Sequence, residues 1–325
     1  MKLTKMFRVS ATVLGCLLVL ISCRQGEDAA SSPLAPVDVK VVNHLVAVLG
    51  HESRVLELVD PASGEKVKSI RLAQPPNGMA VDGATVYVAE GGARGVVEVV
   101  DLESGELKRS FPAGHTPMSP VLREGKLYVA CRFDSRVLEM DAAAGTVLNS
   151  WNVPREPVVL AVSPDGRKIW AAGHLPAGAA DGDFTAAALT LVEDGKAVHF
   201  PLSNGTQGVR GMAISPDGRY LAVAHVLSRY QAPTTQLDRG WMNTNAVTVI
   251  KTDEPDKPHP VLLDDPDAGA ANPWGVSFSG DGGKLFATHA GTHELSVIDF
   301  PALLERMKRE DRSNEPVSER LGFLH

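Results

Sequence analysis

The chain has 325 residues, of which 44% are hydrophobic and 22% charged, so it is neither a disordered tail nor a collagen and can bury a large core. The net charge of -7 at pH 7, with no concentrated Lys/Arg cluster, excludes a nucleic-acid-binding protein. Aromatic residues make up only 5%, whereas there are 30 glycines and 22 prolines. This balance favours many short strands joined by tight turns.

Residues 1–22 have the pattern of an export signal. Lys2, Lys5 and Arg8 precede the apolar run VSATVLGCLLVLIS, which is too short to span a bilayer comfortably. The run ends in Leu-Ile-Ser-Cys, which resembles a bacterial lipobox and implies that Cys23 becomes the lipidated first residue. An uncleaved membrane anchor, or an ordinary signal peptide with a chance cysteine, is the alternative. We expect a protein of the bacterial cell envelope, anchored to lipid and facing the periplasm or the outer membrane.

Residues 23–37 are small, polar and proline-containing, which predicts a flexible tether between lipid and domain. Cys16 leaves with the signal and Cys23 carries lipid, so Cys131 has no partner for an internal disulfide. We expect Cys131 to be a small buried hydrophobic residue.

Residues 38–300 contain six copies of one nine-residue sequence motif. The copies lie at 43–51, 83–91, 125–133, 166–174, 218–226 and 283–291, and equivalent residues are 40, 41, 42, 52 and 64 positions apart. A period near 40 residues that widens by insertion is typical of stacked repeats. Within a repeat, apolar residues alternate with period two over four short runs. The pattern predicts an all-β fold, a β-propeller built from four-stranded antiparallel blades.

The turns of the repeats support this interpretation. Ser-Pro-Asp-Gly at 163–166 and 215–218, and Ser-Gly-Asp-Gly at 279–282, combine an Asp that bonds its own backbone with a Gly that accepts positive φ. The periodic acids Asp60, Asp101 and Asp141 are expected to close turns and not to be catalytic.

The repeats resemble the YVTN repeats of exported bacterial propellers, the YncE-like family. Residues 127–130 (LYVA) and 296–299 (SVID) match that pattern best. Segments 228–245, 269–278 and 288–299 are also similar to the propeller part of long proteins fused to a di-haem cytochrome c peroxidase (MauG-like) domain. This chain has no Cys-x-x-Cys-His motif, so the resemblance places haem only on a separate or missing partner domain, and we predict no cofactor on this chain.

Five repeats have four strand patterns, whereas the sixth has three before a predicted helix at 301–308. The resemblance implies seven blades, so we expect an incomplete seven-bladed ring from a truncated reading frame, with an exposed edge and an apolar blade face. The alternative is a six-bladed ring whose last blade is covered by the helical C-terminal segment, residues 301–325.

In a propeller, the loops from the second strand to the third and from the fourth to the next blade emerge on one side, here called the loop face. We expect this face to bind the ligand or partner, with these candidate residues: Arg210, His225, Arg229, Tyr230, Trp241, Asn243, Trp274, His289 and His293. Converging imidazoles could also form a metal site, whose ligands would be His225, His289, His293 and Glu90. Because no known ligand spacing is present, we favour the alternative, in which a strand-end histidine fixes a loop by bonding a neighbouring carbonyl.

An insertion at 226–244 lengthens one loop of this face and carries arginine and aromatic residues, which are enriched at protein interfaces. We expect it to be the main recognition element; the alternative is a plug over the channel.

Together these observations predict an exported, lipid-anchored propeller that acts as a binding or scaffolding module. One alternative is a docking domain for a di-haem peroxidase-like periplasmic redox protein. Another is a propeller-type lactonase or hydrolase.

Overall fold

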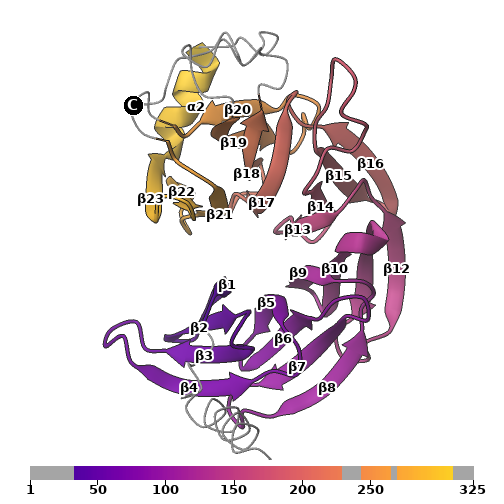
Figure 1. Ribbon diagram of the computed structural model, residues 1–325, viewed down its shortest axis with the longest axis vertical. Helices are drawn as coiled ribbons and strands as arrows, with labels where there is room; N and C mark the ends of the chain where they lie inside the picture. The colour runs from indigo at the N-terminus through magenta and orange to yellow at the C-terminus, as the bar shows by residue number, and fades with distance from the viewer. Residues whose placement is uncertain (1–32, 229–242, 265–268, 310–325) are drawn as a thin grey trace, which may run out of the picture.

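The computed structural model describes residues 33–228, 243–264 and 269–309. Within these ranges there are five four-stranded sheets and one three-stranded sheet, all antiparallel with neighbouring strands consecutive in sequence. Figure 1 shows them arranged as blades around a common centre. The predicted propeller is therefore confirmed, including the three strands of its last blade.

The first three blades cover the N-terminal half of the ring (Figure 1). Their elements are β1 (Pro36–Val42), β2 (Leu45–Gly50), β3 (Val55–Val59), β4 (Lys66–Arg71), β5 (Pro76–Asp82), β6 (Thr85–Glu90), β7 (Val96–Asp101), β8 (Leu107–Pro112), β9 (Pro117–Arg123), β10 (Lys126–Cys131), the 3-10 helix η1 (Arg132–Asp134), β11 (Arg136–Asp141) and β12 (Val147–Asn152).

The other three blades complete the described ring. Their elements are β13 (Pro157–Val162), β14 (Lys168–Gly173), β15 (Ala188–Glu193), β16 (Lys196–Pro201), β17 (Thr206–Ile214), β18 (Tyr220–Ser228), β19 (Asn243–Lys251), β20 (His259–Leu262), β21 (Pro273–Phe278), β22 (Lys284–His289), β23 (Glu294–Asp299) and helix α2 (Phe300–Arg309). No helix in the described ranges is long and apolar enough to cross a bilayer.

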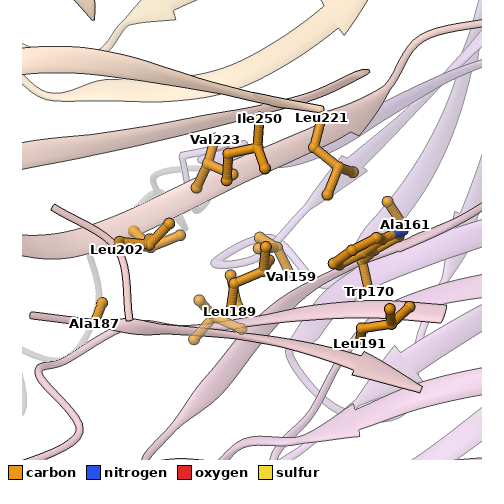
Figure 2. Close-up of a cluster of buried hydrophobic side chains, with 13 residues drawn as sticks. Val159, Ala161, Trp170, Ala187, Leu189, Leu191, Leu202, Leu221, Val223 and Ile250 are labelled. Atoms are coloured by element: carbon orange, nitrogen blue, oxygen red, sulfur yellow. The ribbon is translucent and has the colours of Figure 1, made fainter. Parts of the chain in front are cut away.

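The core consists of apolar layers between successive blades. Figure 2 shows the layer between the fourth and fifth blades, where Trp170 and Leu189 face Leu221 and Val223. All four side chains are fully buried. Large, fully buried side chains such as these contribute most to stability. Removing the apolar surface of one such side chain from water stabilises the fold by about 1.5–3 kcal/mol.

The Ser-x-Asp-Gly turns form as expected. The Ser163 hydroxyl donates to the Asp165 carboxylate at 2.5 Å and accepts the Lys168 backbone N–H at 2.9 Å. The turn at 215–218 repeats both contacts, and Gly166 and Gly218 have φ near +71° and +73°. The expected turn-closing role of the periodic acids is also confirmed, since Asp101 accepts two backbone N–H bonds in its own turn.

The ring opens between its first and last blades (Figure 1). Val39 and Val41 of β1 are exposed on one side, and Leu295 and Val297 of β23 are exposed on the other. Helix α2 does not cover this free face of the sixth blade. Its Phe300 instead packs edge-to-face on Tyr220 and Phe278, toward the fifth blade.

Candidate functional site

The loop face is the side of the ring that carries two kinds of connection. One joins the second strand of a blade to the third, and the other joins the fourth strand to the first strand of the next blade. Hydrogen bonds tie these loops together across blades. For example, the Gly205 N–H between β16 and β17 donates to the Thr185 carbonyl between β14 and β15, at 2.8 Å. Backbone hydrogen bonds of this kind hold the connections of this face against one another.

His225 ends the repeated motif of the fifth blade, and its side chain is fully buried. It lies two residues beyond Val223, which pairs with Thr248 on β19, so both histidine and threonine face the fourth blade. His225 Nε2 is 2.6 Å from Thr248 Oγ1, and its Nδ1 is 3.2 Å from the Val226 carbonyl oxygen. A carbonyl only accepts, so Nδ1 carries the proton and the threonine hydroxyl donates to Nε2. Burial lowers the pKa of His225 to about 4.

His289 occupies the equivalent position in the sixth blade and is also buried. Its Nδ1 donates to the Ala270 carbonyl at 2.9 Å, and its Nε2 accepts from the Ser296 hydroxyl at 2.8 Å. The expectation that His225 and His289 are available on the loop face is therefore wrong. Both rings face the preceding blade, where they satisfy polar groups between sheets.

Glu90 fills the same position in the second blade. It lies beside Glu98, because Val88, two residues earlier on β6, pairs with Glu98 on β7. Both side chains are buried, and Glu90 Oε1 and Glu98 Oε2 have no donor among the described residues. Burial, together with the charge of Glu98, raises the pKa of Glu90 to about 8. At neutral pH Glu90 is therefore protonated and can donate its proton to Glu98.

The four candidate metal ligands do not come together. Glu90 lies between the first and second blades, whereas His225 and His289 lie between the fourth and fifth and between the fifth and sixth. His293 is exposed in the β22–β23 turn, with φ of +59°. The described ranges contain no group of three His, Cys, Asp or Glu side chains placed to hold a metal ion.

Two other histidines of the repeats fix loops, as the favoured interpretation predicted. His51 Nδ1 donates to the Pro76 carbonyl at 2.7 Å, and His174 Nδ1 donates to the Val209 carbonyl at 2.9 Å. Each bond joins one blade to the inner strand of the next. Cys131 is buried as expected. Burial raises the pKa of its thiol to about 12, and the thiol donates to the Ala113 carbonyl.

An arginine–carboxylate pair links the third and fourth blades on the loop face. Arg132, in η1, donates from Nε and Nη2 to one oxygen of Glu156, at 3.1 and 2.9 Å. The Glu156 carbonyl accepts the His174 N–H at 2.8 Å. The His174 ring, bonded to Val209, continues the chain of contacts into β17. Burial, and the positive charges of Arg210 and Arg132, lower the pKa of His174, which keeps the ring neutral.

Arg210 and Trp274 come next along this chain of contacts. Both sit at irregularities of inner strands, Arg210 between Gln207 and Gly211 and Trp274 between Pro273 and Val276. Such bulges redirect a side chain out of the regular alternation. The guanidinium carbon of Arg210 lies 4.5 Å from the centre of the Trp274 ring, a cation–π geometry between the fifth and sixth blades.

The exposed aromatic side chains of the described residues all lie on the loop face. In the described part of the chain, the large aromatic residues that are exposed are Phe133, Phe184 and Trp274, at 50%, 55% and 40%. They lie in the β10–β11 connection, in the β14–β15 connection and at the start of β21, all of which are on this face. Arg132 stacks over Phe133 at 4.9 Å, and His115 packs edge-on against Phe133 at 5.1 Å.

The sequence-based candidates thus separate into three groups. Arg210, Asn243, Trp274 and His293 are exposed in elements of the loop face. His225 and His289 are buried between blades. Arg229, Tyr230 and Trp241 lie outside the described residues, as does most of the insertion at 226–244. Arg132, Phe133 and Phe184 were not predicted from the sequence. Arg132 and Phe133 nevertheless follow a repeated strand directly and differ from the residues at the same positions of the other copies.

Comparison with known proteins supports the fold. Over 152 residues, the chain is 27% identical to the beta subunit of hydrazine synthase from Kuenenia stuttgartiensis. In three dimensions it matches a structure of Kuenenia stuttgartiensis hydrazine synthase with a TM-score of 0.77, over 87% of this chain and 82% of that one. The chain is a β-propeller. The sequence identity to that structure is 21%, so the likeness shows the fold alone.

The sequence match is partial. It covers 46% of this chain and 37% of the length of the hydrazine synthase beta subunit. No family model matches the chain.

Proposed function

We propose that this β-propeller is a binding and scaffolding module that docks a partner protein on its loop face. The observation that supports this function most strongly is the exposure of Phe133, Phe184 and Trp274 on that face. Aromatic residues and arginine are the side chains most enriched at energetically important interface positions. Two of these aromatics already carry an arginine stacked on the ring, Arg132 on Phe133 and Arg210 on Trp274.

The location proposed for this module is the bacterial cell envelope. The basic start, the short apolar run and Leu-Ile-Ser-Cys at 20–23 support export and acylation of Cys23. A lipid-anchored ring on a tether would hold the loop face near the membrane surface, available to a periplasmic partner. The insertion at 226–244 leaves the ring on the same face, so Tyr230 and Trp241 are proposed to extend the docking surface.

A second candidate is more specific: the partner is a redox protein, and this chain is a non-catalytic component of its assembly. Two sequence likenesses favour it. One is the resemblance of segments 228–245, 269–278 and 288–299 to propellers fused to a di-haem peroxidase-like domain. The other is the similarity to a protein whose name designates it a subunit of hydrazine synthase. Any haem would then belong to the partner.

Site-specific photo-crosslinking in native cell envelopes tests the docking function. A photoreactive residue is placed at Phe133, Phe184 or Trp274 on the loop face, and as a control at Val147 or Val198 on outer strands. The control positions have similar exposure, 51% and 50%, but lie away from the loop face. We expect one discrete partner band from the loop-face positions and none from the controls. Equal capture at both sets of positions, or no capture at Phe133 and Trp274, would count against this function.

A further inference from the structure

Four arginines in the described ranges stack on aromatic rings, and they differ in what else they contact. Arg132 is paired with Glu156, and Arg219, over Tyr220, is paired with Asp217 at 2.6 Å. Arg109, over Phe111, donates to the Ala143 carbonyl. Within the described residues, Arg210 has the Trp274 ring but neither a carboxylate nor a carbonyl partner. Its five N–H donors therefore have no acceptor among the described residues.

Neighbouring residues hold Arg210 in place, and another neighbour, Arg132, is positively charged. Trp274 holds one face of the guanidinium, and the backbone on either side is fixed by the contact of the His174 ring with the Val209 carbonyl and by the close approach of β17 to β21. The side chain of Arg210 is exposed, but partial desolvation of the guanidinium, followed by the positive charge of Arg132, lowers its pKa. The charged form is thus under repulsion that an added anion would relieve. The Glu156 carboxylate is not paired with Arg210, because both of its described side-chain hydrogen bonds come from Arg132.

We propose that Arg210, stacked on Trp274 and flanked by Arg132, binds a carboxylate group at the inner edge of the loop face. A planar guanidinium with its fork free matches a carboxylate in two parallel hydrogen bonds. The inference deepens the proposed function and rests on it, since an acidic side chain of a docked partner would meet Arg210. A free dicarboxylate would present the same chemistry.

Nuclear magnetic resonance of the full chain in detergent tests this inference without any partner. The Arg210 Nε–H and Trp274 indole N–H signals are followed while succinate, a hexaglutamate peptide or sodium chloride is added. We expect saturable shifts in the millimolar range, about 1–10 mM, with a carboxylate and none with chloride. Saturation by succinate would identify a free acid as a sufficient ligand. Saturation by the peptide alone would identify polypeptide carboxylates.

Two variants make the test specific. Arg210→Gln should weaken binding about tenfold or more, because charge-assisted bonds are lost. Arg219→Gln is the control. It removes an arginine that stacks on Tyr220 in the β17–β18 turn, on the side of the propeller opposite the loop face, and should leave binding unchanged. Should Arg210→Gln fold poorly, Arg210→Lys keeps the charge and should still bind more weakly, because the planar fork is gone.

Binding that survives in both Arg210 variants, or shifts that never saturate with either carboxylate, would overturn the assignment. Since no partner is involved, carboxylate binding without crosslinking at Phe133 and Trp274 would refute only the docking function.

Discussion

Arg210 and Trp274 come from inner strands of successive blades, and their cation–π contact at 4.5 Å depends on how closely those strands approach. Gly211 permits this approach. A Cβ atom on Gly211 would lie 2.3 Å from the Trp274 carbonyl oxygen and 3.0 Å from the Val276 nitrogen. Arg210 and Trp274 are therefore positioned by a backbone contact in which only glycine fits.

Gly211→Ala should separate β17 from β21 and destabilise the fold by about 1–3 kcal/mol, the usual cost of overpacking. Denaturant unfolding measures this change. Gly280→Ala is the matched control, because an added Cβ there meets no atom within 4 Å. Equal stability of the two variants would show that the approach of the two strands is not constrained at Gly211.

The buried pair of Glu90 and Glu98 should make the protein less stable as pH rises. Glu90 has a pKa of about 8 in the folded state and 4.5 when exposed, so between these values the folded state holds a proton that the unfolded state has released. The free energy of unfolding should fall across this window, with a slope of at most about 1.4 kcal/mol per pH unit. Glu90→Gln, which cannot ionise and can still donate to Glu98, should remove that contribution. An unchanged pH profile in Glu90→Gln, matching that of the exposed control Glu103→Gln, would contradict the protonated pair.

His225 should act in the opposite direction. Its pKa is about 4 in the fold and 6.5 when exposed, so acidification protonates the unfolded state first. Stability linked to His225 should be complete above about pH 6.5 and be lost as the pH falls toward 4. His225→Gln should flatten this acid limb in pH-dependent unfolding. His293→Gln removes an exposed histidine and should leave the limb in place; if both variants behave alike, His225 does not titrate as a buried group.

Cys23 is predicted to carry the lipid. Mass spectrometry of the mature N-terminus should find an acylated cysteine at position 23, and Cys23→Ser should leave the precursor unprocessed or release the protein from membranes. A mature N-terminus at another residue, without acyl chains, would mean that the chain is not anchored in this way.

Much of the fold could be predicted because its signals are local. Alternating apolar residues and Ser-x-Asp-Gly turns specify a strand pair within about 15 residues, and the repeat then specifies the stacking. The positions of His225 and His289 could not be predicted in this way. A strand-end residue faces either the neighbouring blade or the solvent according to the strand register, and a shift of one residue reverses the outcome.

The contacts of the arginines could not be predicted from the sequence either. Arg132 and Glu156 are 24 positions apart, and Arg210 and Trp274 are 64 apart. Their contacts exist only after neighbouring blades have stacked. Arg210 and Trp274 can be predicted as candidates because they lie where the chain enters the first strand of a blade, whereas no sequence pattern marks Phe133 and Phe184.

If the loop face binds the partner, changes to its exposed aromatic residues should raise the dissociation constant of the crosslinked partner. Phe133→Ala/Trp274→Ala should weaken binding about thirtyfold or more, the equivalent of about 2 kcal/mol for interface anchors, with a nearly unchanged unfolding midpoint. Val147→Ala/Val198→Ala should bind like the wild type. Wild-type affinity in the Phe133→Ala/Trp274→Ala variant, or an equal loss in the Val147→Ala/Val198→Ala variant, would mean that the partner does not bind at the loop face.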